Sequence, residues 1–238
     1  TSTDFIDSEY CKKNNICIIS LQKEQKFLKT ITSTAEHVLG LILLISRKYI
    51  PAIKSIEEKK FNRRPFGGHQ MLSRSSIGII GYGRLGKIVK KISKNIFKNV
   101  YTADTKMDKL KYKKNLEKIF TYCDYITLHI HSRGNTKFFD QKNLPPFKKN
   151  FFLINTSRGE VVNENFIIKL LSSKKILGYA TDVLTGEFKR NFDIKKNIIF
   201  RNRIKYNIVI TPHIGGSTID AWNLTEKRVI ESLIKKKI

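Results

Sequence analysis

The chain has 238 residues and a formal net charge of +26, with 46 lysine and arginine residues against 20 acidic residues. A chain of this length can bury a sizeable core and can hold one large domain or two small ones. The basic residues are spread along the whole chain rather than gathered in one arm or one helix. We therefore interpret the charge as a solvated basic surface and expect no nucleic-acid partner.

Cysteine usage and hydropathy indicate a cytoplasmic protein. The three cysteines, Cys11, Cys17 and Cys123, show neither a CxxC pair nor zinc-ligand spacing, so we expect reduced thiols and no metal site. No signal peptide is recognisable. The longest apolar run, residues 38–45, is too short to span a bilayer, so we expect no membrane partner.

The first part of the chain predicts a short N-terminal segment, one long helix and a connection. A strand is predicted at Ile16–Ser20. A helix is predicted from Ser33 to about Tyr49, where Pro51 would stop it. Because apolar side chains lie nearly all round this helix, it should be buried. The polar and basic segment that follows Pro51 is interpreted as a connection.

From Ile77 onward, short apolar runs alternate with helical stretches. Apolar strands separated by helices predict a parallel sheet covered on both faces, and right-handed crossovers make it a doubly wound α/β fold. The predicted strands are Ile77–Gly81, Val100–Asp104, Asp124–Ile130, Phe151–Asn155, Gly178–Val183 and Ile208–Thr211. The predicted helices are Leu85–Ile96, Leu116–Tyr122, Asn165–Leu171 and a last one at about Thr218–Lys236.

A glycine-rich turn, Gly81-x-Gly83-x-x-Gly86, joins the first of these strands to its helix. Such a turn leaves backbone N–H groups pointing outward at the start of a helix, which is a ready site for a pyrophosphate. Gly81 allows the tight turn, Gly83 lets the backbone approach the phosphates, and Gly86 lets the helix sit close to the strand. Asp104 ends the next strand, where an acid can bind a ribose 2′-hydroxyl and disfavours a 2′-phosphate. The sequence therefore predicts NAD as cofactor; the alternative is an ordinary tight turn with Asp104 as a strand-end acid.

Arg158, Glu187 and His213 each follow one of the last three strands. Ligands bind beyond the carboxyl ends of such strands, so all three residues should lie at the edge that carries the glycine turn. A guanidinium suits a substrate carboxylate, and an imidazole oriented by a carboxylate can exchange a proton with a carbonyl or alcohol oxygen. With a nicotinamide nearby, this set predicts hydride transfer on a 2-hydroxy or 2-oxo acid. Taken singly, each could be a surface charge, a loop acid or a packed loop histidine.

At these positions the chain resembles the D-isomer-specific 2-hydroxyacid dehydrogenases, the family that includes D-3-phosphoglycerate dehydrogenase. The resemblance covers essentially the whole chain, and several of its motifs together in this order are highly specific. The motifs are residues 34–37 (TAEH), 78–86 (GIIGYGRLG), 123–129 (CDYITLH), 154–159 (INTSRG), 181–183 (TDV) and 211–217 (TPHIGGS).

The resemblance implies a role for each site residue. Arg158 would bind the carboxylate and carbonyl of the substrate, and His213, paired with Glu187, would donate and accept the proton. Thr1 and Ser2 resemble a segment whose backbone amides hold the substrate carboxylate, so they are expected in the substrate pocket. The residues implied to bind NAD are Gly81, Gly83, Arg84, Leu85, Gly86, Asp104, Thr156, Ser157, Asp182, Ile214, Gly215 and Gly216.

The resemblance also implies a domain organisation. Residues 1–28 would be the remnant of a flavodoxin-like substrate-binding domain, residues 29–216 the Rossmann NAD-binding domain, and residues 217–238 the C-terminal helix that returns to the substrate domain. The chain departs from the family in lacking most of the substrate domain, so we expect an incomplete gene product. It departs again at Phe188, where the family usually has proline after the catalytic glutamate.

Two functions follow from this reading. The first is an NAD-dependent dehydrogenase acting on the CH–OH group of a D-2-hydroxy acid, with 3-phosphoglycerate, glycerate, lactate or a sugar-derived acid as candidate substrates. The alternative is a non-catalytic NAD-binding interaction or regulatory protein, because relatives of this fold act as transcriptional corepressors. Helices like the one beginning at Ser33 often pair two subunits in this family, so we expect a homodimer.

Overall fold

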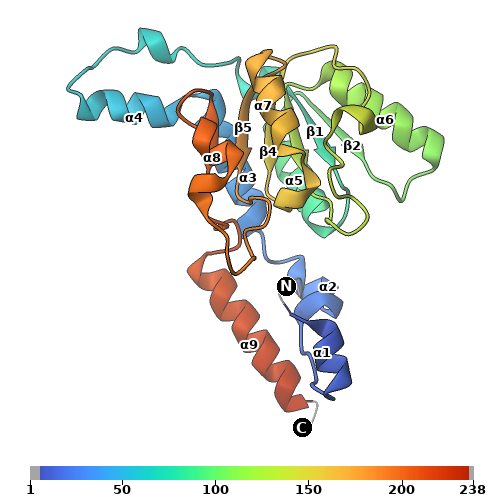
Figure 1. Cartoon of the computed structure of the whole chain (residues 1–238). Coiled ribbons are helices and arrows are strands. Elements are labelled where there is room, and N and C mark those ends of the chain that lie inside the picture. Colours follow the sequence, from blue (N-terminus) through green and yellow to red (C-terminus); the bar gives the residue numbers. More distant parts are fainter. Residues whose placement is uncertain (1–5, 236–238) are drawn as a thin grey trace. The chain divides into compact units, whose positions relative to one another are not determined.

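The computed structural model describes residues 6–235, which form two compact units (Figure 1). The larger unit comprises residues 34–215 and contains the sheet, and the smaller unit comprises the residues before and after it. The domain boundaries expected at 28/29 and 216/217 stay predictions, as does the assignment of the smaller unit to a substrate-binding domain.

The larger unit is built on a sheet of six parallel strands in the order β2-β1-β3-β4-β5-β6. This arrangement confirms the predicted doubly wound parallel sheet. After β1 the chain passes to β2 on one side and then crosses to β3 on the other, so the strand order reverses between β1 and β3. The strands are β1 (Ser76–Ile80), β2 (Asn99–Ala103), β3 (Tyr125–Leu128), β4 (Phe151–Asn155), β5 (Ile176–Thr181) and β6 (Ile208–Ile210).

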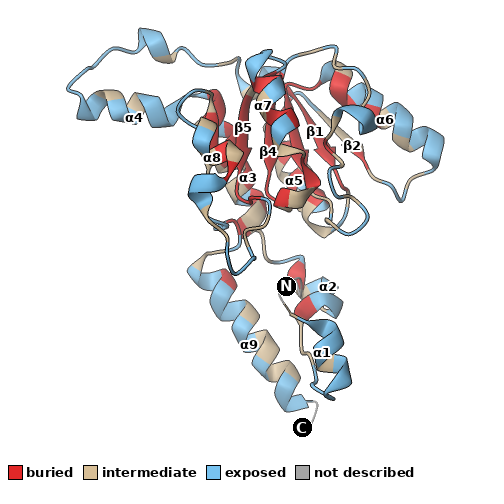
Figure 2. Ribbon diagram, in the orientation of Figure 1, coloured by how far each residue is buried: buried red, intermediate tan, exposed pale blue. Residues whose placement is uncertain are grey.

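The α-helices of this part of the chain are α3 (Ser33–Ser46), α4 (Tyr49–Glu57), α5 (Arg84–Ser93), α6 (Lys109–Tyr122), α7 (Glu164–Ser172) and α8 (Ile198–Asn202). Short 3₁₀ turns lie at η2 (Arg64–Phe66), η3 (Leu72–Arg74), η4 (Gln141–Asn143), η5 (Gly159–Val161) and η6 (Ile194–Lys196). Successive strand residues point to opposite faces of the sheet, so each face has its own core. Ile79 packs in the cluster formed with α3 and α5, whereas the adjacent Ile80 packs in the cluster formed with α6 and α7. Buried residues accordingly concentrate in the strands and the helix faces that cover them (Figure 2).

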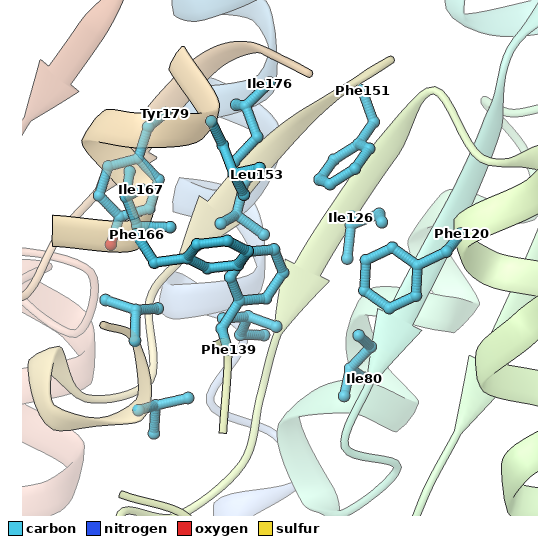
Figure 3. Packing of buried hydrophobic residues seen from close by; sticks show 14 of the residues in the cluster. Ile80, Phe120, Ile126, Phe139, Phe151, Leu153, Phe166, Ile167, Ile176 and Tyr179 are labelled. Carbon is cyan, nitrogen blue, oxygen red and sulfur yellow. The ribbon is translucent and has the colours of Figure 1, made fainter. Parts of the chain in front are cut away.

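Phenylalanine side chains from four separate segments fill the core on the α6 and α7 side (Figure 3). Phe139 is fully buried in the segment between β3 and β4. Its ring centroid lies 6.1–6.5 Å from four other rings, those of Phe120, Phe147, Phe151 and Phe166. Aromatic contacts at these distances add about 0.5–1.5 kcal/mol per pair beyond the burial of apolar area.

The helix predicted from Ser33 to about Tyr49 is present as α3, and a second helix, α4, follows where a connection was predicted. α3 ends at Ser46, and Lys48 adopts a left-handed φ of 52° before α4 begins at Tyr49. Pro51 lies in the first turn of α4, where the N–H groups have no intrahelical partner, so the missing N–H of proline is tolerated. The prediction that Pro51 stops a helix and opens a connection was therefore wrong.

By length and composition the stretch Gln25–Ser46 could cross a membrane, with a mean hydropathy of 1.4. In the structure α3 is a core helix of the sheet unit. Val38, Leu41, Ile42 and Ile45 are all 0% exposed and pack in the same cluster as the strand residues. The burial predicted for this helix is thus confirmed for these four side chains.

α6 begins at Lys109, well before the predicted start at Leu116. Asp108 caps it and accepts hydrogen bonds from the N–H groups of Leu110 at 3.0 Å and Lys111 at 3.1 Å. The first turns of α6 are rich in lysine and lack apolar periodicity, so the pattern alone placed the start too late.

The smaller unit contains α1 (Ser8–Lys13), η1 (Leu21–Lys23), α2 (Gln25–Leu28) and α9 (Ile219–Lys235). Arg228 of α9 lies 2.9 Å from the Glu24 carboxylate and 5.8 Å from the ring centroid of Phe27. The strand predicted at Ile16–Ser20 was wrong, because this segment pairs with no strand within residues 6–235. Without a partner, a strand has no ladder of backbone hydrogen bonds to stabilise it.

We expect Phe139→Ala to lower the free energy of unfolding by about 3–5 kcal/mol, because it removes a fully buried ring and leaves a cavity. Urea unfolding followed by circular dichroism measures the change. Leu110→Ala on α6 is the matched control, since Leu110 is 76% exposed and should change stability by less than about 0.5 kcal/mol. Equal losses in the two variants would contradict the place of Phe139 in the core.

Candidate functional site

The predicted site residues of the larger unit lie where the parallel strands end. The glycine turn follows β1, Asp104 follows β2, Arg158 follows β4, and Asp182 follows β5. His213 follows β6. Parallel strands present their carboxyl ends at one edge of the sheet, so the fold brings together residues that are far apart in the sequence.

The glycine turn depends on close backbone contacts at two of its three glycines. Gly81 has a left-handed φ of 97°, and a Cβ there would collide with the carbonyl group of His129. A Cβ at Gly86 would collide with the carbonyl oxygen of Gly81, so only glycine lets α5 approach β1 this closely. A Cβ at Gly83 would meet nothing within 4 Å. Gly83 is therefore not needed for packing and leaves open space in front of α5.

The start of α5 is electrostatically suited to an anion. Gly83 is its N-cap and provides no side-chain hydrogen bond to the first N–H groups. The aligned peptide dipoles place partial positive charge at this end of the helix. The ammonium groups of Lys87 and Lys90 add to it, at 5.8 Å and 4.8 Å from the ring centroid of Tyr82.

Asp104 is hydrogen-bonded to the glycine turn. Its carboxylate accepts from the N–H of Tyr82 at 2.5 Å and from the N–H of Lys106 at 2.8 Å. Each carboxylate oxygen has a second lone pair, so a hydroxyl group can still donate to it. Asp104 thus places a negatively charged acceptor for a hydroxyl group beside the glycine turn.

His129 lies where the strand order reverses, although the sequence did not single it out as a site residue. It follows β3, and its N–H donates to the carbonyl of Ile80 at 2.7 Å. Burial lowers the pKa of the imidazole to about 3, so the ring is neutral at pH 7. Nε2 lies 2.9 Å from the Thr127 hydroxyl, and the buried Nδ1 has no partner among the described residues. Its only sequence signal was its place at the end of the 123–129 motif.

Asn155 shapes the turn that carries Arg158. Its fully buried side chain accepts from the backbone N–H and hydroxyl of Ser157 at 3.0 and 2.7 Å, and donates to the Arg158 carbonyl at 3.0 Å. The Arg158 guanidinium donates to the Ser157 carbonyl at 2.6 Å. Sequence reasoning missed this role of Asn155, although a polar residue ending an apolar strand was a visible signal.

His213 and Glu187 form the expected acid–histidine pair. The imidazole Nδ1 lies 2.7 Å from Glu187 Oε1, and Oε2 accepts from the N–H of Leu184 at 3.0 Å. An ionised carboxylate can only accept, so Nδ1 carries the proton and Nε2 is left for chemistry. The hydrogen bond with Glu187 raises the pKa of His213 above its ordinary value, against the lowering effect of burial. Phe188 packs beside this imidazole, with ring centroids 5.5 Å apart.

The buried carboxylate of Asp182 holds the loop that presents His213. Asp182 is 2% exposed, and its carbonyl accepts from the N–H of His213 at 3.0 Å. Burial alone would raise the pKa of the carboxyl, but hydrogen bonds to the charged form outweigh it and lower the pKa. The groups around the carboxylate are the N–H groups of Ile214 (2.9 Å) and Gly215 (2.8 Å), the Thr211 hydroxyl (2.5 Å) and Nε2 of His37 (3.3 Å).

The Arg158 turn and the Glu187 turn are packed against each other. A Cβ at Gly159 would collide with the backbone between Leu184 and Thr185. Glu187 raises the pKa of His213 and the charge of Arg158 lowers it, so these three groups interact electrostatically. The structure therefore brings the three expected catalytic side chains together from three separate loops.

The residues present suit a bound dinucleotide. The space at Gly83 is open, the N-terminus of α5 faces it without a side-chain cap from Gly83, and Asp104 retains acceptor capacity. Thr156, at the end of β4, has a buried hydroxyl with no partner in the described part of the chain. Within residues 6–235, no group of three or more His, Cys, Asp or Glu side chains could hold a metal ion.

Three expected site residues are not part of this geometry. Thr1 and Ser2 lie outside the described residues, so their expected contact with substrate stays a prediction. Gly216 belongs to the smaller unit.

Arg84 and Leu85 are the first residues of α5, as their expected backbone contacts with a pyrophosphate require.

Comparison with known proteins identifies the family. Residues 39–215 match the family described as D-isomer specific 2-hydroxyacid dehydrogenase, NAD binding domain. A D-3-phosphoglycerate dehydrogenase of Haemophilus influenzae is 32% identical over 194 residues, which are 79% of this chain and 46% of that protein. A glycerate dehydrogenase of Methylorubrum extorquens is 26% identical over 240 residues, 98% of this chain and 72% of that protein.

Solved structures share the fold. A D-lactate dehydrogenase from Aquifex aeolicus, complexed with NAD and lactic acid, matches 98% of this chain and 74% of its own with a TM-score of 0.77 at 24% identity. The chain spans about half the length of the phosphoglycerate dehydrogenase that it matches. The match over residues 39–215 covers the whole sheet and the loops that carry Arg158, Glu187 and His213. The chain belongs to the D-isomer-specific 2-hydroxyacid dehydrogenase family and contains the NAD-binding domain of that family.

Proposed function

We propose that this chain supplies the NAD-binding and proton-transferring parts of an NAD-dependent dehydrogenase, which interconverts a D-2-hydroxy acid and the corresponding 2-oxo acid. The observation that carries the proposal is the His213–Glu187 pair, 2.7 Å apart, beside Arg158 at the edge that holds the glycine turn. A non-catalytic NAD-binding protein has no use for an imidazole oriented in this way. The intact pair therefore favours an enzyme.

The cofactor-binding residues divide along the edge of the sheet. The start of α5 at Gly83 would hold the pyrophosphate, and Asp104 would accept a hydrogen bond from the adenosine ribose. The negative charge of Asp104 disfavours the 2′-phosphate of NADP, so we assign NAD. Thr156 and Asp182 would lie on the nicotinamide side. Bound NAD supplies the nicotinamide that accepts or donates the hydride.

His213 moves the proton through Nε2. In the direction of reduction, the protonated imidazole gives its Nε2 proton to the carbonyl oxygen of the 2-oxo acid; in the reverse direction, Nε2 takes the proton of the hydroxyl group. Glu187 stays bound to Nδ1 and stabilises the imidazolium. Because this contact raises the pKa of His213, the proton remains available near neutral pH.

Arg158 recognises the acid group of the substrate. Its planar guanidinium can donate two parallel hydrogen bonds to a carboxylate and carries a permanent charge. The same charge can polarise the adjacent carbonyl group at C2. This chemistry specifies a 2-hydroxy or 2-oxo acid but not the rest of the molecule. Similarity to a phosphoglycerate dehydrogenase supports 3-phosphoglycerate as the first substrate to test.

We place the protein in the cytoplasm. Cys11, Cys17 and Cys123 form no disulfide with one another, as expected in a reducing compartment. The buried side chains of α3 belong to the core of the sheet unit, where an apolar helix needs no membrane.

We also propose a homodimer that is formed through α4. This helix has no buried residue (Figure 2). Its exposed large apolar side chains are Tyr49, Ile50, Ile53 and Ile56. A cavity of about 1070 Å³ extends from α4 and the edge strand β6 to the proposed catalytic pair, since Glu187 and His213 are among its lining residues. The dimer contact is therefore assigned to the exposed helix and not to the cavity, because the same apolar helix on two copies is the self-complementary arrangement that a two-fold dimer requires.

The first expected result is binding of NADH to this chain, with clearly weaker binding of NADPH. Nicotinamide fluorescence measures both affinities. Gly83→Val should weaken NADH affinity by roughly ten- to a hundredfold, because its side chain would enter the space assigned to the phosphates and remove charge-assisted hydrogen bonds worth about 1.5–3 kcal/mol.

Gly83→Val should leave the fold intact, because Gly83 has a φ of −73° and open space where a side chain would go. A circular dichroism melt checks this point. A folded Gly83→Val chain that binds NADH as well as the parent chain would contradict the assignment of the glycine turn.

The second expected result concerns the pH dependence of turnover with NADH and a 2-oxo acid. Reduction requires protonated His213, so its rate should fall as the pH rises through the pKa of His213. Glu187→Ala removes the contact that raises this pKa, and the fall should then occur at lower pH. His213→Ala should lower kcat by about 10²–10⁴-fold.

A pH–rate profile with several 2-oxo acids, 3-phosphohydroxypyruvate among them, makes these measurements. Oxidation of the hydroxy acid provides the internal control, because its rate should show the opposite pH dependence. Unchanged turnover in His213→Ala would contradict the proposed proton transfer.

The third expected result is that Ile53→Glu weakens the dimer by roughly thirtyfold or more, because it places a charge in the centre of an apolar contact. Sedimentation velocity over a concentration series gives the association constant. Lys91→Glu on the exposed side of α5 is the control for added negative charge and should leave the association unchanged. A parent chain that is monomeric at all concentrations would exclude the homodimer.

A further inference from the structure

Two glutamates outside the expected catalytic set follow Arg158 in the sequence, Glu160 in η5 and Glu164 at the start of α7. Both reach the turn formed by residues 184–187, which ends in Glu187. Glu160 Oε1 accepts from the N–H of Gly186 at 3.0 Å, and Glu164 Oε1 accepts from the N–H of Thr185 at 3.0 Å.

The 184–187 turn thus has three consecutive backbone N–H groups that donate to three different carboxylates. The N–H of Leu184 donates to Glu187 itself at 3.0 Å, and the next two donate to Glu164 and Glu160. Hydrogen bonds to charged acceptors are stronger than those between neutral groups. The path of the chain between β5 and Glu187 is therefore set largely by side chains that belong to the Arg158 segment.

Glu164 also connects the turn to α8. Asn197, the N-cap of α8, donates its amide to both oxygens of Glu164 at 3.1 and 2.9 Å. Gly159 adds a contact between backbones, because a Cβ there would collide with the Leu184–Thr185 peptide. Three separate contacts thus fix one turn against the other.

We propose that Glu160 and Glu164 are positioning residues, which hold the Glu187 turn at a fixed place relative to Arg158 and so keep Glu187 in contact with His213. Their importance for catalysis rests on the proposed function. Their effect on the His213–Glu187 contact does not depend on it. In this arrangement Arg158, which would bind the substrate carboxylate, and the His213–Glu187 pair, which would move the proton, are held together. The carboxylates that follow Arg158 in the sequence bind the turn that carries Glu187.

The charged groups that act on His213 are Glu187, Asp182 and Arg158, and neither positioning residue is among them. The pKa of His213 therefore reports the position of Glu187 and not the charge of Glu160 or Glu164. NMR titration of a chain with ¹³C-labelled histidine measures this pKa without cofactor or substrate. A His213→Gln chain assigns the resonance, and Glu187→Ala defines the pKa when the contact is lost.

We expect Glu160→Ala and Glu164→Ala to shift the pKa of His213 downward, part of the way to the value in Glu187→Ala. Glu160→Gln and Glu164→Gln keep an oxygen acceptor for the turn while they remove the charge, so they should restore the pKa of the parent chain. Asp108→Ala is the matched control. Asp108 also accepts from backbone N–H groups, those of Leu110 at 3.0 Å and Lys111 at 3.1 Å, but it lies at the start of α6 and bonds to neither Glu160 nor Glu164.

Hydrogen exchange of the parent chain tests the same contacts without any variant. Thr185 is exposed, yet its amide and that of Gly186 should exchange slowly because both are bound to carboxylates. Fast exchange at these two amides would overturn the proposal. So would a His213 pKa that stays unchanged in both alanine variants, or one that moves equally in the alanine and glutamine variants.

The two proposals fail separately. A chain in which the His213 pKa responds as expected but which lacks turnover with any 2-oxo acid would retain the positioning role and lose the dehydrogenase. A chain with turnover but with a His213 pKa that does not respond would do the reverse.

Discussion

The position of the imidazole in this site depends on one buried carboxylate, that of Asp182. An ionised group that is 2% exposed is stable only when its oxygens are hydrogen-bonded, and here backbone N–H groups, a hydroxyl and an imidazole meet that need. Two of those N–H groups belong to the residues directly after His213. Because the buried carboxylate must be hydrogen-bonded, it holds the loop in place. The loop in turn keeps His213 in its left-handed backbone conformation.

The other two expected catalytic side chains, Arg158 and Glu187, are held in a similar way. Each is positioned by a polar group that takes no part in the proposed reaction. Asn155 fixes the Arg158 turn, and Leu184 gives its N–H to Glu187. Close backbone packing at Gly159 joins the two turns. These contacts hold the side chains in place without a bound ligand, which is the preorganisation that the proposed reaction requires. The site is built from loops that follow the ends of the parallel strands.

Much of this could be read from the sequence. The glycine spacing after an apolar strand indicated the βα turn, because only glycine tolerates the left-handed φ at Gly81 and the collision that a Cβ would cause at Gly86. The continuous apolar runs indicated a parallel sheet covered on both faces. The errors came where local pattern and tertiary context disagree. Pro51 lies in a first helical turn that tolerates it, and the apolar segment at residues 16–20 has no partner strand within the described chain.

By itself the sequence determined the type of sheet, the glycine turn and the identity of the chemical groups, since these follow from periodicity, backbone sterics and side-chain chemistry. Only the tertiary structure decided how those groups are held. The place of Asp182 at the centre of the His213 loop depends on contacts between segments that are distant along the chain, and so do the contacts of Glu160 and Glu164 with the Glu187 turn. A carboxylate's partner is set by where the folded backbone directs its N–H groups, and no local pattern contains that information.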